Sequence, residues 1–91
     1  MRDRTVQRLN ESPAFTATRS WGTSYIFPRV LVTATDQELA VAIKERAGVI
    51  VNPGYQFGAG GVGHMRLCIA QDEREWEDAL ERLIEVVESY I

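Results

Sequence analysis

Arg66 is the residue of this sequence whose type and surroundings point most directly to ligand chemistry. Only two residues separate it from a glycine-rich stretch, and it lies in an otherwise apolar alternating run, residues 64–70. A planar guanidinium flanked by Met65 and Leu67 needs a partner, and its fork of N–H donors suits a carboxylate best. The residue types alone leave two interpretations open: a carboxylate-binding site, or an internal ion pair or exposed edge-strand arginine.

The glycine-rich stretch, residues 58–63, matches G-x-G-x-x-G. In a dinucleotide-binding site this turn must open a helix, whose N-terminus then meets the pyrophosphate. Here the glycines lead into the alternating run, which predicts a strand, and neither Lys-Ser nor Lys-Thr follows as in a phosphate-binding loop. We therefore expect a loop that lets backbone approach backbone or a ligand closely.

Four other residues carry side chains that can do chemistry, and each has an ordinary structural interpretation. Lys44 is the only lysine among ten basic residues, so any lysine nucleophile of this chain must be Lys44; its position favours a solvated helix face. His64 has no Cys or carboxylate at metal-ligand spacing and is expected to be packed or hydrogen-bonded. We expect Cys68 to be a small buried residue and Trp76 to be core or interface packing.

The spacing of apolar residues predicts the elements that position these side chains. We expect a helix over 2–10, strands over 15–18, 24–32, 49–51 and 64–70, a helix from Thr35 to Ala47, and a final helix from Asp72. The strand over 24–32 should bend or lie at a sheet edge at Pro28. Thr35, with Glu38 three residues on, and Asp72 are the expected N-caps, and Gly48 is the expected left-handed residue after the middle helix. In residues 64–70, Met65, Leu67 and Ile69 face one way and Arg66 and Cys68 the other. The order α-β-β-α-β-β-α predicts an α+β fold, with helices covering a small, mostly antiparallel sheet.

The composition limits the class of protein. Ninety-one residues, 45% hydrophobic and 25% charged, predict one globular domain over residues 1–91. A lone cysteine rules out an internal disulfide and favours the cytoplasm, and neither a signal peptide nor a membrane span is expected. Net charge runs from +3 over residues 1–35 to −6 over residues 72–91, which argues against nucleic acid as a partner.

Several segments together resemble the C-terminal part of class I/II pyridoxal-phosphate-dependent aminotransferases. Residues 52–67 are similar to that family's "V-x-P-G-x-x-F-G-x-x-G-x-G-H-x-R-L" motif, and residues 21–28 to its "G-x-x-Y-x-F-P" strand. Residues 37–51 resemble its "E-L-A-x-x-L-L-E-x-A-G-V-x-V" helix and strand, and residues 72–91 its final helix. The resemblance implies the small domain of such an enzyme, with the large cofactor-binding domain absent from this chain.

The resemblance implies that Arg66 binds the α-carboxylate of an amino-acid or keto-acid substrate. It also implies pyridoxal phosphate as the family's cofactor, whose Schiff-base lysine belongs to the large domain; Lys44 is outside that motif. We therefore expect a chain that does not bind the cofactor or catalyse by itself, and that pairs with a large domain, a second aminotransferase chain or a copy of itself. Two alternatives stay open: a non-enzymatic binding or dimerisation module, and an inert remnant.

A small domain of this kind should also expose apolar surface where other domains or subunits pack. The candidates are Trp21, Tyr25, Phe57 and the face formed by Val6 and Leu9.

Overall fold

The computed structural model of the chain describes residues 2–17, 25–68 and 72–91. Within these ranges it holds three helices, α1 (Arg2–Glu11), α2 (Asp36–Ala47) and α3 (Glu73–Glu88). Five short strands accompany them: β1 (Phe15–Thr16), β2 (Tyr25–Ile26), β3 (Arg29–Val30), β4 (Asn52–Pro53) and β5 (Met65–Cys68). Two 3₁₀ turns, η1 (Gly54–Phe57) and η2 (Ala59–Gly61), form the glycine-rich segment. Residues 21–24, the first half of the segment that resembles the family's "G-x-x-Y-x-F-P" strand, lie outside the described residues.

The ends of α2 are set by the local sequence, as the capping pattern predicts. The Thr35 side chain accepts a hydrogen bond from the backbone N–H of Glu38, at 3.1 Å. Gly48 ends the helix in the left-handed conformation, with φ of 71°, and its N–H donates to the Lys44 carbonyl at 3.2 Å. Asp72 caps α3 in the way that Thr35 caps α2, accepting from the Glu75 N–H at 2.9 Å.

All described strand pairs are antiparallel, which confirms the predicted α+β class. β5 lies at the centre of a three-stranded sheet in the order β2-β5-β4, and β1 pairs with β3 in a second, two-stranded sheet. Across the larger sheet, Leu67 is opposite Ile26 and Arg66 is opposite Asn52. The strand that carries Arg66 is therefore flanked on both sides.

Two strand predictions need correction. The strand predicted over 24–32 is two strands, β2 and β3, interrupted at Phe27 and Pro28; Pro28 has no N–H for a ladder, and its carbonyl accepts from Met65. The strand predicted over 49–51 is wrong, because pairing with β5 begins only at Asn52 and Ile50 is 77% exposed. A run of only three apolar residues does not determine at which residue the pairing with a neighbouring strand begins.

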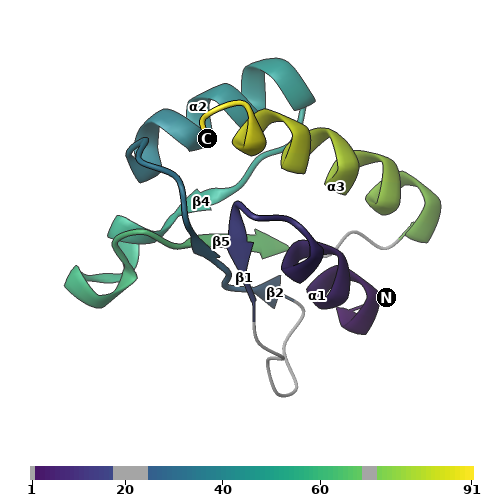
Figure 1. Ribbon diagram of the computed structural model, residues 1–91, viewed down its shortest axis with the longest axis horizontal. Helices are drawn as coiled ribbons and strands as arrows, with labels where there is room; N and C mark the ends of the chain where they lie inside the picture. The colour runs from purple at the N-terminus through teal and green to yellow at the C-terminus, as the bar shows by residue number, and fades with distance from the viewer. Residues whose placement is uncertain (1, 18–24, 69–71) are drawn as a thin grey trace.

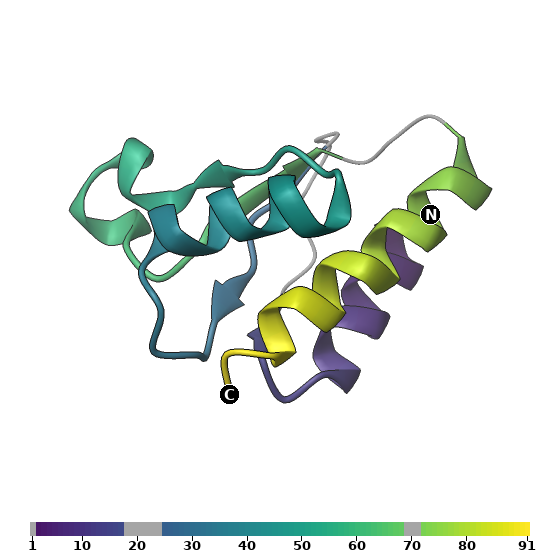
Figure 2. The same cartoon turned by 90° about the horizontal axis from the view of Figure 1, so that it is seen from above.

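The helices cover one side of the larger sheet. α2 lies over β4 and β5, and α3 runs beside α2 (Figures 1 and 2). The core between them is formed by large apolar side chains with almost no exposed surface: Ile26, Leu39, Ile43, Met65, Leu67, Leu83 and Val87. Helix α1 packs against β1 and α3 and adds Leu9 to this core.

The prediction that Val6 and Leu9 form an exposed face is wrong. Leu9 is fully buried and Val6 packs at the edge of the core, because α3 and β1 cover this side of α1. Phe57 is 47% exposed, as predicted. The side chains of Trp21 and Tyr25 lie outside the described part of the structure. Among residues 2–17, 25–68 and 72–91, no helix has both the length and the apolar run that a membrane span requires.

Candidate functional site

The face of β5 that carries Arg66 is the one turned away from the core. Met65 and Leu67 are 2% and 1% exposed, whereas Arg66 between them is half-buried and Cys68 is exposed. This alternation confirms the predicted orientation of the strand. The prediction that Cys68 is buried is wrong: Cys68 is exposed, and the alternation of the strand places it on the same face as Arg66.

The Arg66 guanidinium is held by the neighbouring strand. Its Nε and Nη2 atoms both donate to the side-chain oxygen of Asn52, at 3.1 and 2.9 Å. Asn52 is the residue directly opposite Arg66 in the register of β4 and β5, so both side chains project from the same face. An amide is neutral, so this contact orients the guanidinium and does not itself bring a negative charge to it.

One aromatic ring lies beside the guanidinium, and two further rings pack in series behind it. Its central carbon is 5.2 Å from the centre of the Phe57 ring, within the range of a cation–π contact. Phe57 meets Phe27 edge to face at 5.6 Å, and Phe27 stacks on His64 with ring centres 5.0 Å apart. His64 is therefore a packed residue, as predicted; its Nδ1 lies 3.3 Å from the Val62 carbonyl.

The glycine-rich segment between β4 and β5 folds back on itself by direct contact of backbone with backbone. Gly54 donates to the His64 carbonyl at 2.8 Å, and a Cβ built on Gly54 or Gly61 would overlap the carbonyl oxygen of the other. The segment leads into β5 and not into a helix, which confirms that its G-x-G-x-x-G pattern is not a dinucleotide-binding turn.

Asp36 is the site residue that the sequence analysis missed. Its buried carboxylate accepts hydrogen bonds from the backbone N–H groups of Tyr55 and Gly63, at 2.9–3.1 Å. These partners are 19 and 27 residues away along the chain. The only local signal was an acidic residue directly after the helix cap Thr35, and such a residue is favourable at a helix N-terminus whatever else it does.

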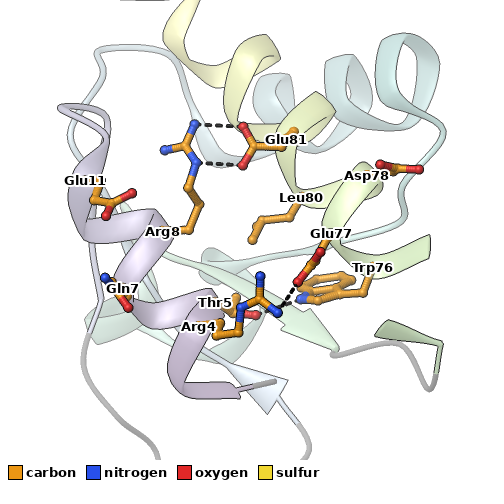
Figure 3. Close-up of a pocket in the computed structure, with 10 residues that line it drawn as sticks. All are labelled: Arg4, Thr5, Gln7, Arg8, Glu11, Trp76, Glu77, Asp78, Leu80 and Glu81. Carbon is orange, nitrogen blue, oxygen red and sulfur yellow. Dashed lines mark hydrogen bonds and ion pairs between the residues drawn. The ribbon is translucent and has the colours of Figure 1, made fainter. Parts of the chain in front are cut away.

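A separate groove of about 420 Å³ lies between α1 and α3 (Figure 3). Its walls are formed by Arg4, Thr5, Gln7, Arg8, Glu11, Trp76, Glu77, Asp78, Leu80 and Glu81. Arg8 on α1 donates from Nε and Nη2 to both carboxylate oxygens of Glu81 on α3, at 2.6 and 2.8 Å, and Arg4 Nη1 lies 2.6 Å from Glu77. The charges pair across the groove, so we interpret it as the junction of two packed helices.

Trp76 is buried at this junction, in agreement with its predicted role in packing. Its indole Nε1 donates to the Thr5 hydroxyl at 2.7 Å, and both residues are at most 4% exposed. The hydrogen bond satisfies the polar atom of a large buried ring. It also joins the beginning of α1 to the beginning of α3.

Comparison with known proteins decides the family. The family model for "Aminotransferase class I and II" matches residues 1–83. This chain belongs to the class I and II aminotransferase family. The match confirms the resemblance found in the sequence, and it covers every element that builds the Arg66 site.

Individual aminotransferases agree with the family match. The chain is 35% identical over 82 residues to an aspartate aminotransferase of Pyrococcus abyssi, and 34% identical over 82 residues to an aromatic-amino-acid aminotransferase of Thermococcus litoralis. Each alignment covers 89% of this chain and 21% of the relative. The chain thus spans about a fifth of the length of these aminotransferases.

Solved aminotransferase structures contain the same fold. The alanine aminotransferase of Pyrococcus furiosus matches with a TM-score of 0.88 at 31% identity, over 97% of this chain and 23% of that one. The aspartate aminotransferase of Rhodobacter sphaeroides matches with a TM-score of 0.89 at 29% identity, over 98% and 23%. The described structure therefore corresponds to part of an aminotransferase.

The family implies pyridoxal phosphate, and the residues of this chain do not fit the covalent attachment of that cofactor. Lys44, the only lysine, is exposed on α2. Leu39 and Ile43, on the buried side of α2, share one core with Met65 and Leu67 of β5. Met65 and Leu67 project from the face of β5 opposite Arg66, so α2 lies on that opposite side of the sheet. Lys44 and Arg66 therefore lie on different sides of the sheet. The described residues also hold no group of three or more His, Cys, Asp or Glu side chains suited to a metal ion.

Proposed function

We propose that this chain acts as the small domain of a pyridoxal-phosphate-dependent amino-acid aminotransferase and supplies Arg66 to bind the substrate α-carboxylate. The observation that carries the proposal is the pair of hydrogen bonds by which Asn52 holds the Arg66 guanidinium on the open face of the sheet. This contact orients the planar guanidinium of a half-buried side chain on that face. A carboxylate matches its planar fork of donors.

The chain by itself lacks the means to complete a transamination. The reaction requires a lysine that attaches the cofactor near the substrate amine, and Lys44 is exposed on the helix-covered side of the sheet. We infer that a large domain carrying that lysine comes from further polypeptide. Residues 1–91 then form one domain of the assembled enzyme, in the cytoplasm, where the single cysteine is expected to remain reduced.

The exposed apolar residues near the ends of β4 and β5 support a partner for this chain. Phe57, which lies 5.2 Å from the Arg66 guanidinium, is 47% exposed. Three further large apolar residues of the segment before β4 and of the loop between β4 and β5 are exposed by 46–77%: Ile50, Tyr55 and Val62. Exposed apolar side chains of this size are typical of an interface or a ligand-binding groove. The same observation favours a second candidate function, a binding module that pairs with another aminotransferase chain without taking part in catalysis.

Titration of the isotope-labelled chain with L-alanine and pyruvate, followed by NMR, tests the carboxylate site. We expect the amide signals of β4 and β5 to shift with either ligand and to remain unchanged with alaninamide, which lacks the carboxylate. Arg66→Ala should abolish the shifts. Arg66→Lys, which keeps the charge but loses the fork, should weaken binding about tenfold or more.

Arg74→Ala is the matched control, because Arg74 is an exposed arginine on α3. If Arg74→Ala weakens binding as much as Arg66→Ala does, the ligand responds to overall charge and the Arg66 site is wrong. If the wild-type chain binds neither L-alanine nor pyruvate, the inert-remnant alternative is favoured. A shift of the pyridoxal phosphate absorbance band on adding the chain, lost in Lys44→Ala, would contradict the inference that the chain does not hold the cofactor.

A further inference from the structure

Asp36 is a buried carboxylate whose hydrogen bonds go to another segment and not to its own helix. The N-terminus of α2 is already capped by the Thr35 side chain, which accepts from the Glu38 N–H. The Asp36 oxygens instead accept from Tyr55 N–H at 3.1 Å, and from Gly63 N–H at 2.9 and 3.1 Å. At 9% exposure the carboxylate has little access to solvent, so these backbone donors are its main stabilisation.

The two backbone groups bound by Asp36 lie at opposite ends of the glycine-rich loop, which is the segment between β4 and β5, residues 54–64. Tyr55 is in the first 3₁₀ turn after β4, and Gly63 comes two residues before β5. Between them, residues 55–60 are exposed and contribute little buried surface to hold the loop. Within this stretch Phe57 reaches back to the Arg66 guanidinium, 5.2 Å from its ring centre.

We propose that Asp36 is a positioning residue of the Arg66 site: its carboxylate ties together the two ends of the loop and so places the Phe57 ring beside the guanidinium. As far as it concerns substrate, this inference rests on the proposed carboxylate-binding function of Arg66. The placement of Phe57 itself does not depend on that function. Among the described residues, the hydrogen bonds given for Asp36 go to the backbone of the loop and those given for the guanidinium go to Asn52, so Asp36 acts through the loop.

Both carboxylate oxygens of Asp36 take part in the contact. One oxygen accepts from Gly63 alone, and the other from both Tyr55 and Gly63. Asparagine has the same shape but presents only one oxygen, and in either orientation of the amide its NH₂ group would face the backbone N–H of Gly63. Asp36→Asn should therefore release one end of the loop while leaving the Thr35 cap of α2 intact.

NMR of the full chain without ligand gives the first test. In the wild type we expect NOEs between the Phe57 ring and the Arg66 side chain, and slow exchange of the Tyr55 and Gly63 amides compared with the amide of Gly60. Asp36→Asn should remove these NOEs and speed the exchange of at least one of the two amides. Glu38→Gln is the matched control, because it removes an acidic charge from the same turn of α2 at an exposed position; it should leave both signals unchanged.

Binding of pyruvate gives the second test. We expect Asp36→Asn to weaken the affinity about tenfold, the effect of one unmade hydrogen bond, and Glu38→Gln to change it less than twofold. Phe57→Leu should weaken the affinity for pyruvate by a similar factor. The double variant Asp36→Asn/Phe57→Leu should bind pyruvate no more weakly than the weaker-binding single variant does, because both substitutions act through the Phe57 ring.

The inference would be overturned if the losses of pyruvate affinity in Asp36→Asn and Phe57→Leu add up in the double variant. It would also be overturned if Asp36→Asn is less stable but retains the Phe57–Arg66 NOEs. If Asp36→Asn fails to fold, fast exchange of both the Tyr55 and Gly63 amides in the wild type would overturn it equally. A wild-type chain that shows the NOEs but does not bind pyruvate contradicts the proposed function and leaves the placement of Phe57 by Asp36 supported.

Discussion

Asn52 and Arg66 face each other across β4 and β5, and two donors of the guanidinium share the single side-chain oxygen of the amide. A carboxylate at position 52 would make an even stronger contact but would neutralise the charge that a ligand needs. The amide at position 52 therefore orients Arg66 without itself adding a negative charge that competes with an incoming anion. This relationship is the basis of the first prediction.

Asn52→Asp should weaken binding of pyruvate about tenfold or more, because the new carboxylate competes with the ligand for the same guanidinium. The fold should be retained, since aspartate keeps the shape and the acceptor. Gln56→Glu, which places the same charge at an exposed position of the neighbouring loop, is the control. The NMR titration used for Arg66→Ala measures both variants, and equal weakening in the two would mean that general repulsion is responsible.

Because Gly54 and Gly61 are in close contact, alanine substitutions at the neighbouring glycines Gly60 and Gly61 should differ strongly in their effect on stability. Gly61→Ala should destabilise the chain by about 1–3 kcal/mol, because its Cβ would overlap the Gly54 carbonyl oxygen. Gly60→Ala should change stability by less than about 0.5 kcal/mol, because a Cβ there meets nothing within 4 Å. Urea unfolding of both variants measures the difference, and similar midpoints would contradict the structure of this loop.

The buried hydrogen bond from Trp76 to Thr5 should contribute measurably to stability. Thr5→Val keeps the size of the side chain but leaves the indole N–H without its acceptor, at an expected cost of about 1–3 kcal/mol. Thr33→Val, at an exposed position, is the matched control. Thermal unfolding followed by circular dichroism measures both; a Thr5→Val variant as stable as the wild type would show that the indole finds another partner.

The ion pair between Arg8 and Glu81 should contribute little, despite its two short hydrogen bonds. Arg8 and Glu81 side chains are 33% and 55% exposed, so solvent screens the pair and Arg8→Ala should cost less than about 1 kcal/mol. A double-mutant cycle with Glu81→Ala, repeated at low and high salt, measures the coupling. A coupling that is large and insensitive to salt would contradict this prediction.

The pH dependence of this pair follows from the direction of the Arg8 pKa shift. The hydrogen bond to Glu81 raises the pKa of Arg8 above its ordinary value, outweighing the opposing effect of burial. Because the pKa of Arg8 is higher in the folded chain than in the unfolded chain, the protonated arginine stabilises the fold. This stabilisation is complete at pH values below the pKa of the unfolded chain, and it is lost only as the pH rises through the pKa of the folded chain. The Arg8–Glu81 coupling should thus be the same at neutral and at mildly alkaline pH.

Features that depend on near neighbours could be predicted from the residue types and their spacing. The caps at Thr35, Gly48 and Asp72 join groups three or four residues apart, so local spacing was enough to predict them. The same holds for the orientation of Arg66, because strict alternation along one strand assigns every side chain to a face. The family resemblance came from motifs that lie within such short segments.

Contacts between distant segments could not be predicted from the sequence and are known from the folded chain. The partners of Asp36 lie 19 and 27 residues away, and Asn52 meets Arg66 across 14 residues. Such contacts depend on strand register and on how helices cover a sheet, and the residue types leave both undetermined. The exposure of Cys68 and the burial of Leu9 were mispredicted for the same reason: a face is buried only where another element packs on it.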